Sequence, residues 1–218
     1  MIALLARARA EGVASQKATR LLSGSLDWFL AQKFPSTSES LYGAVYSPTG
    51  EGTRSPSAWC YGDPGVAAAL FCAAHWTSDS RLEQEAHETG LHAVRRSPTT
   101  AGVVDAPLCH GATGLGHLYN RMYQATREIA YLEGARAWFS RALEMRRTGE
   151  GIGGYLYREE DDWRIDWGLL GGATGIALAF LAGATFVEPS WDRLMLASIP
   201  PIGVVDGGQF VSGLAGYV

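Results

Sequence analysis

The chain has 218 residues, of which 47% are hydrophobic and 18% charged, and its formal net charge is −4. This composition is typical of one globular domain that buries a substantial core. The chain is acidic, with a pI near 5.7, so it lacks the excess of basic residues that binds nucleic acid or an anionic membrane. No apolar run reaches the roughly 18 residues that span a bilayer, and the run at 2–5 is too short for a signal peptide. We therefore expect a cytoplasmic protein with no membrane span and no nucleic-acid partner.

Periodic apolar residues predict a chain made mainly of helices. The first two helices are expected over 2–11 and 16–33, with Gly12 and Pro35 as breaks. The stretch 36–57 is rich in Ser, Thr, Gly and Pro and predicts a long connection with room for one short strand pair. Further helices are expected over 65–76, 80–95, 112–126, 128–147 and 172–184, with loops over 97–108 and 148–166.

The helices alternate between two kinds. Short helices rich in small residues, as around 67–69 and 177–182, suit an inner ring, and longer charged helices suit an outer ring that faces water. The sequence therefore predicts an all-α fold, an α/α toroid of repeated helix pairs. The acidic run at 159–162 is expected to be a solvated loop, or else a contact for a basic segment of a substrate.

A glycine motif recurs three times, each time before an inner helix. Residues 60–65, 109–114 and 170–175 align so that glycines fall on glycines, with intervals of roughly 49 and 61 residues. The first two copies begin with cysteine and the third begins with Leu170. We interpret the glycines as scaffold and the thiols as an addition to it. Asp63-Pro64 predicts a helix start, with the aspartate accepting from the first free amides.

This register predicts that Cys60, Cys109 and His110 lie together at one rim of the ring. The positive end of each helix favours thiolate over thiol. Two thiolates and one imidazole match a zinc site with an open fourth position, which is the pattern of catalytic sites. The alternative is that both cysteines belong to the core and His110 is a hydrogen-bonded cap.

The remaining thiol and histidines are expected to have no ligand role. Cys72 lies in the apolar run 66–76 and is predicted to be a buried core thiol. An odd number of sparse cysteines fits a reducing compartment. The other histidines show no ligand pattern and are interpreted as packed, structural or solvated; they are His75, His87, His92 and His117.

Taken together, these motifs resemble the lanthionine synthetase C family, the LanC cyclases and their LanC-like relatives. The resemblance rests on Trp-Cys-Tyr-Gly at 59–62, Cys-His-Gly at 109–111, the segment 168–178 and the ending 187–194. It covers the chain from Ile2 to about Ser198. It implies an α/α toroid with a zinc ion held by Cys60, Cys109 and His110.

The resemblance also implies a reaction. In LanC cyclases a cysteine of a dehydrated precursor peptide adds to dehydroalanine or dehydrobutyrine and forms a thioether ring, after a lanthipeptide dehydratase has acted. The addition needs a proton donor for the resulting enolate. Tyr61 is the matched candidate for this acid; its alternative role is packing under the site.

The sequence departs from the family at two places. Pro56 stands where family cyclases carry an arginine, and the nearest arginine is Arg54; an earlier histidine motif is also missing. Residues 1–198 are therefore expected to be the C-terminal portion of a LanC-like toroid, about half of the ring, and 199–218 a tail. The missing half would come from another chain, a second copy or upstream sequence.

Two further function classes stay open. One is a non-cyclising LanC-like module that binds glutathione or peptide thiols through the same zinc. The other is a carbohydrate- or isoprenoid-processing barrel, which needs paired inward carboxylates or aspartate-rich motifs; Asp161-Asp162 alone supports it poorly.

Overall fold

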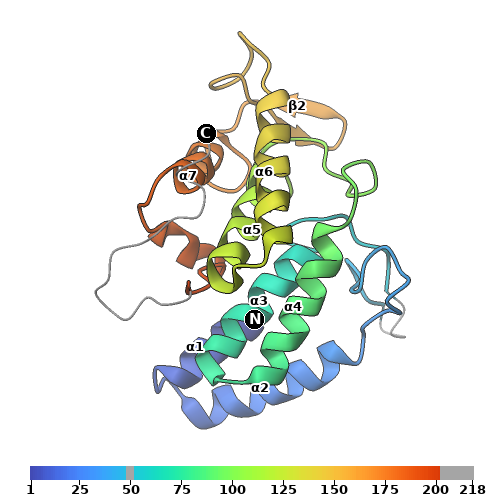
Figure 1. Ribbon diagram of the computed structural model, residues 1–218, viewed down its shortest axis with the longest axis vertical. Helices are drawn as coiled ribbons and strands as arrows, with labels where there is room; N and C mark the ends of the chain where they lie inside the picture. The colour runs from blue at the N-terminus through green and yellow to red at the C-terminus, as the bar shows by residue number, and fades with distance from the viewer. Residues whose placement is uncertain (48–51, 202–218) are drawn as a thin grey trace.

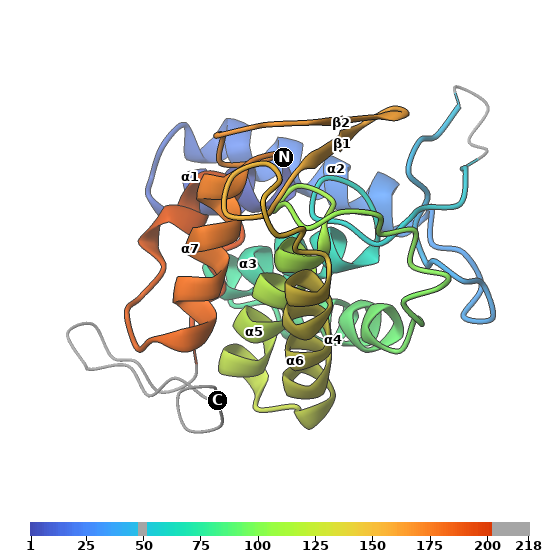
Figure 2. The same cartoon turned by 90° about the horizontal axis from the view of Figure 1, so that it is seen from above.

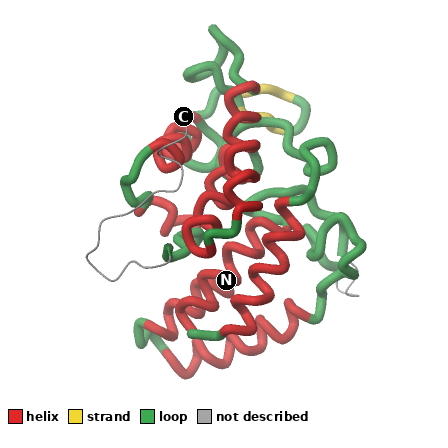
Figure 3. The backbone as a smooth tube through the Cα atoms, in the orientation of Figure 1, coloured by secondary structure: helices red, strands yellow, loops and turns green. Residues whose placement is uncertain are grey.

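The computed structural model of the chain describes residues 1–47 and 52–201, and the all-α prediction is confirmed for them (Figure 3). Helices dominate, with one small hairpin between the sixth and seventh. The elements are α1 (Ile2–Ala10), α2 (Ser15–Leu30), α3 (Asp63–Thr77), α4 (Ser80–Val94), α5 (Ala112–Thr126), α6 (Ile129–Glu144), β1 (Tyr157–Glu159), β2 (Asp162–Arg164), α7 (Ala173–Ala184) and the 3-10 helix η1 (Ser190–Met195).

The helices form two layers (Figure 1). Consecutive helices pair as α1–α2, α3–α4 and α5–α6, and the first members of the pairs contact one another in the series α1, α3, α5, α7. Nearly every residue of α5 is buried, whereas α4 buries a single face around Leu82, Ala86 and Ala93. This difference confirms the expected inner and outer layers, since a helix packed on several sides needs small or apolar residues all round. Figure 2 shows the same layers from above.

The helix start at α3 is built differently from the prediction. The residue before the helix is Gly62, and the Asp63 carboxylate accepts no hydrogen bond from the first turn. Its two oxygens accept instead from the backbone amides of Leu41 at 2.8 Å and Tyr42 at 3.0 Å. The buried aspartate therefore ties the long connection after α2 to the start of α3.

The two long connections also differ from expectation. In place of a strand pair within 36–57, the described residues form an isolated bridge between Tyr46 and Gly52; residues 48–51 lie outside the described part. The predicted loop at 148–166 contains the antiparallel hairpin β1–β2. The acidic run forms its turn, where Asp161 pairs with Arg158 at 3.0 Å and Glu159 with Arg164.

The segment after α7 folds back under the inner layer. Its buried anchor is Asp192 of η1, which lies 3.1 Å from Nε of Arg121 and 3.3 Å from Nε2 of His117, both on α5. The Arg121 guanidinium also pairs with Glu188, at 2.9 and 3.2 Å. We call Asp192, His117, Arg121 and Glu188 the α5–η1 charge network. It joins residues about 70 positions apart, which the sequence pattern did not indicate.

Two further expectations concern the tail after residue 198 and the lack of a membrane span. Ala197 and Ile199 are buried, so ordered packing continues past Ser198, and most of the expected tail, 202–218, lies outside the described residues. Within the described ranges no helix is both long and apolar enough to cross a membrane.

Candidate metal centre

The three copies of the glycine motif lie side by side at one rim. The backbone amides of Trp59 and Cys60 both donate to the carbonyl of Cys109, at 3.1 and 3.4 Å. The amide of Cys109 donates in turn to the carbonyl of Leu170 at 2.9 Å. Equivalent positions of the three repeats are therefore hydrogen-bonded in series, as the repeat register predicts. This ladder holds the two cysteine-bearing loops together before the side chains contribute anything.

The last glycine of each copy allows the loop to cross over its own helix. A Cβ at Gly65, Gly114 or Gly175 would lie 2.0, 2.0 or 1.8 Å from a backbone carbonyl oxygen six residues earlier. No side chain fits at that distance, so only glycine permits the close approach. The recurring glycine thus has the scaffold role that the alignment of the three copies predicted.

The predicted ligand residues come together. Sγ of Cys60, Sγ of Cys109 and a ring nitrogen of His110 all lie within 4.8 Å of one another. Ligands at zinc bond lengths of about 2.0–2.3 Å sit roughly 3.5–4 Å apart, so small side-chain rotations bring these atoms onto one ion. Cys60 is exposed and the other two are half-buried, which leaves the cluster open to solvent on one side. The donor set and its spacing fit a metal ion with an open position.

The ionisation of the two thiols is linked. A hydrogen bond with Cys109 lowers the pKa of the Cys60 thiol to about 5, with further help from His110. The same hydrogen bond, together with burial and the nearby Cys60 charge, raises the pKa of Cys109. The Cys60 thiolate also raises the pKa of His110. The cluster therefore favours a thiolate at Cys60.

Two residues that lie beside His110 were not predicted from the sequence as part of the site. Oδ2 of the buried Asp105 lies 3.7 Å from Nε2 of His110 and accepts from the Arg158 amide at 3.0 Å. The ring of Tyr157, on β1, lies 5.7 Å from the imidazole. A carboxylate behind a metal-binding histidine orients its ring and tautomer. The available signal was the recurrence of aspartate at Asp166, four positions before the third copy, as Asp105 is before the second.

Tyr61 lies beside the cluster and faces solvent. Its side chain is 38% exposed. Partial burial, followed by the charges of Cys60 and Cys109, raises the pKa of its hydroxyl above the usual value. The phenol is therefore neutral and able to donate a proton at neutral pH. Arg54 is directed elsewhere: its guanidinium pairs with Glu39 and donates to the Thr100 carbonyl at 3.5 Å.

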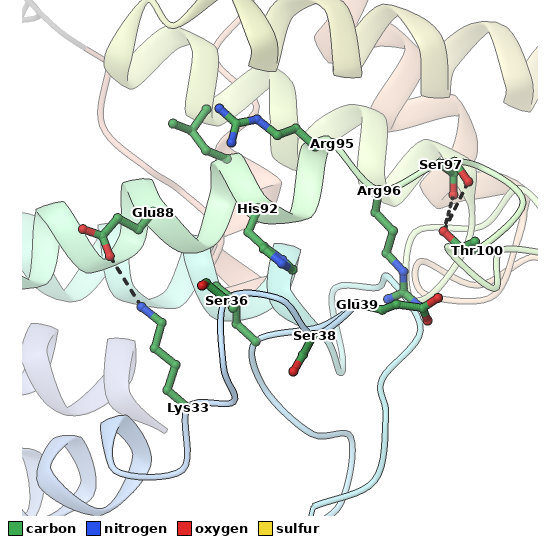
Figure 4. A pocket seen from close by; sticks show the side chains of 12 residues that line it. Lys33, Ser36, Ser38, Glu39, Glu88, His92, Arg95, Arg96, Ser97 and Thr100 are labelled. Atoms are coloured by element: carbon green, nitrogen blue, oxygen red, sulfur yellow. Dashed lines mark hydrogen bonds and ion pairs between the residues drawn. The ribbon is translucent and has the colours of Figure 1, made fainter.

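The residues predicted to have no ligand role lie away from the cluster. Cys72 is buried, as expected, with Sγ 3.4 Å from the Leu196 carbonyl. His117 belongs to the α5–η1 charge network, and His92 lies 3.4 Å from Asp63. Figure 4 shows His92 on α4 and Arg96 just after it extending toward the loop after α2, across a cavity of about 600 Å³ whose lining includes many charged residues.

The helices form a two-layered arc, and the Cys-Cys-His cluster lies at the rim of its inner layer. This combination is typical of one class of protein, the α/α toroids with a candidate metal site at the rim. The family model for lanthionine synthetase C-like proteins matches residues 1–196. The chain therefore belongs to the lanthionine synthetase C-like family.

A solved structure confirms the fold. Nisin cyclase superposes with a TM-score of 0.64 at 17% sequence identity, over 90% of this chain and 47% of the nisin cyclase chain. The likeness shows the α/α toroid, as predicted. The chain spans about half the length of this relative.

Proposed function

We propose that the chain is a zinc-dependent protein of the lanthipeptide cyclase type. It would activate a cysteine thiol of a dehydrated precursor peptide, made by a dehydratase, for addition to dehydroalanine or dehydrobutyrine. The single observation that carries the proposal is the open cluster of Cys60, Cys109 and His110. The need for reduced thiolate ligands favours a reducing compartment such as the cytoplasm.

Cys60, Cys109 and His110 would hold the ion. When bound, zinc supplies a Lewis acid that keeps a substrate thiol deprotonated near neutral pH. Two protein thiolates offset the charge of the ion, which leaves the substrate sulfur nucleophilic. The Asp105 carboxylate, 3.7 Å from Nε2 of His110, would orient the ring when the ion is bound, and the Cys109 carbonyl fixes the loop that carries Cys60.

Tyr61 is our candidate proton donor. Addition of the thiolate to the β-carbon of a dehydroamino acid forms the carbon–sulfur bond and an enolate, which takes one proton at the α-carbon. The raised pKa of the Tyr61 hydroxyl keeps this proton available. Tyr61→Phe retains the ring but removes the proton, so it should slow ring formation without loss of metal; an unchanged rate would assign Tyr61 to packing.

Ring formation can be measured directly. The zinc-loaded chain is incubated with a dehydrated, cysteine-containing precursor peptide, and the remaining thiols are alkylated and counted by mass spectrometry. We expect thiols to become resistant to alkylation with no change in peptide mass, because addition is an isomerisation. Full alkylation despite bound zinc would exclude cyclase activity for this chain.

A non-cyclising function is the second candidate. Pro56 stands at the position of the family's arginine, and Arg54 is engaged by Glu39. The residues that would bind a thiol are therefore present, whereas the arginine that family cyclases carry is not. Binding of glutathione or a peptide thiol by the zinc-loaded chain, without ring formation, would identify this function.

The metal itself is tested by composition. Cys60→Ala and Cys109→Ala should each lower bound zinc well below one equivalent, whereas Cys72→Ala, a matched change at a buried thiol, should retain it. Elemental analysis after dialysis against trace chelator gives the ratio. Unchanged zinc in both ligand variants would remove the basis of both candidate functions.

A further inference from the structure

An apolar cavity of about 450 Å³ adjoins the metal centre. It lies between the starts of α1 and α3, and Cys60 forms part of its wall. Apart from Cys60, the side chains that line it, among the described residues, are uncharged. Its apolar wall includes Phe29, Trp59, Val66, Ala69, Leu70 and Met195.

A hydrogen bond to η1 fixes Trp59, the part of the cavity wall next to Cys60. The indole N–H of Trp59 donates to the Met195 carbonyl at 2.9 Å, which turns the ring into the cavity wall and leaves it no free polar atom. Met195 is buried at the end of η1, and η1 is anchored to α5 through Asp192. The cavity is therefore formed before any ligand enters, and a pre-formed site binds with less loss of entropy.

The size and polarity of the cavity suit one kind of occupant. Its volume lies in the range of small-ligand pockets, which are lined mainly by apolar groups. A charged group placed there would lose much of its hydration, because the wall is mainly apolar. Neighbouring residues of a peptide are separated by about 3.8 Å between Cα atoms. Because Cys60 belongs both to the cluster and to the cavity wall, a peptide that turns at its bound cysteine puts the side chain next to it at the mouth of the cavity.

We propose that this cavity binds an apolar side chain that is adjacent in sequence to the substrate cysteine presented at the Cys60–Cys109–His110 cluster. The proposal rests on the proposed function, because it assumes that a peptide thiol binds at the cluster. It assigns a selectivity for peptides in which a bulky apolar residue directly flanks the reacting cysteine.

Competition calorimetry with the zinc-loaded, full-length chain tests the proposal. The probes are N-acetyl dipeptide amides Leu-Cys and Cys-Leu, their Gly counterparts and their Asp counterparts, which present similar thiols. At least one leucine dipeptide should bind about tenfold more tightly than its glycine counterpart, the increase expected when a leucine side chain is largely buried. The aspartate dipeptides should bind most weakly. Equal affinities for all six would overturn this proposal alone, whereas no binding by any thiol would overturn the proposed function as well.

Variants locate the effect. Ala69→Leu fills the cavity and Val66→Thr makes it more polar at constant shape, so both should reduce the preference for leucine dipeptides. In Ala69→Leu the affinities for the leucine and glycine dipeptides should differ by no more than about twofold. Val94→Thr, the same change on α4 and away from the cavity, should leave the preference intact. Full preference in both cavity variants would refute the assignment. So would a preference that changes with protein concentration, which would indicate that a second copy fills the cavity.

Discussion

Cys60 and Cys109 occupy equivalent positions in the repeat, yet their thiols differ in ionisation. The hydrogen bond between the two thiols, with help from His110, lowers the pKa of Cys60, and the same bond together with burial and the nearby Cys60 charge raises the pKa of Cys109. Sequence alignment within the chain treats the two as identical. The contact between their side chains, set by the backbone ladder at Cys109, makes them chemically distinct.

We expect Cys60 to be the reactive thiol of the metal-free chain. Because its pKa is lowered to about 5, the thiolate is present above that pH and disappears as the pH falls through it. Alkylation by iodoacetamide should therefore stay fast at neutral pH and slow down only in acid, when followed by peptide mass spectrometry. Cys72, whose pKa burial raises to about 12, is the internal control and should not react while the chain is folded. A Cys60 that reacts only in alkaline solution would contradict this assignment.

Gly114 should tolerate no side chain. In Gly114→Ala the new Cβ would lie 2.0 Å from the Leu108 carbonyl oxygen, which is backbone and cannot move aside. We expect the free energy of unfolding to fall by several kcal/mol, with strain as the cause. Gly24→Ala on α2 is the control: nothing lies within 4 Å of its new Cβ, and stability should rise by about 0.5–1 kcal/mol. Urea unfolding compares the two, and similar effects would disprove the steric role.

At the scale of elements, helices were predictable and their partners were not. The expected α5, 112–126, agrees with the structure in both bounds, and the others agree to within a few residues. Apolar periodicity and glycine or proline breaks are local signals, which explains this success. The hairpin β1–β2 was missed because its strands have only three residues each. It is held in part by tertiary contact, since the Arg147 guanidinium lies 4.1 Å from the Trp163 ring.

The α5–η1 charge network should contribute strongly to stability. Asp192→Asn removes the charge that Arg121 and His117 face but preserves the volume, so it leaves a buried guanidinium less well compensated. We expect unfolding to become easier by about 3–5 kcal/mol, as for other broken buried pairs. Glu144→Gln, which breaks an exposed pair with Arg141, should change stability by less than about 0.5 kcal/mol. Denaturant titration measures both, and a neutral Asp192→Asn would show that the network is not required for folding.

At the scale of the whole molecule, apolar side chains remain exposed at both ends of the helical series. Leu4 on α1 and Leu181 on α7 are each more than half exposed, as is Phe186 just after α7. Large exposed apolar surfaces mark interaction sites in soluble proteins. They agree with the expectation that another chain, a second copy or upstream sequence completes the ring.

We expect the chain to associate with itself as its concentration rises. The double variant Leu4→Gln with Leu181→Gln should shift the association to higher concentration in sedimentation velocity runs, because it makes both terminal helices more polar. Leu143→Gln, an equally exposed change on α6, is the matched control and should have little effect. A wild-type chain that stays monomeric at high micromolar concentration would argue against completion by a second copy.

The sequence by itself predicted the grouping of Cys60, Cys109 and His110, the repeat register and the helical arrangement. These depend on residue identity and on spacing within single repeats, which local backbone geometry converts into structure. Only the tertiary structure decided that the pKa of Cys60 is lowered by its neighbours and that Asp192 anchors η1 to α5. Such features arise from contacts between side chains of elements distant in sequence, and no local pattern encodes those contacts.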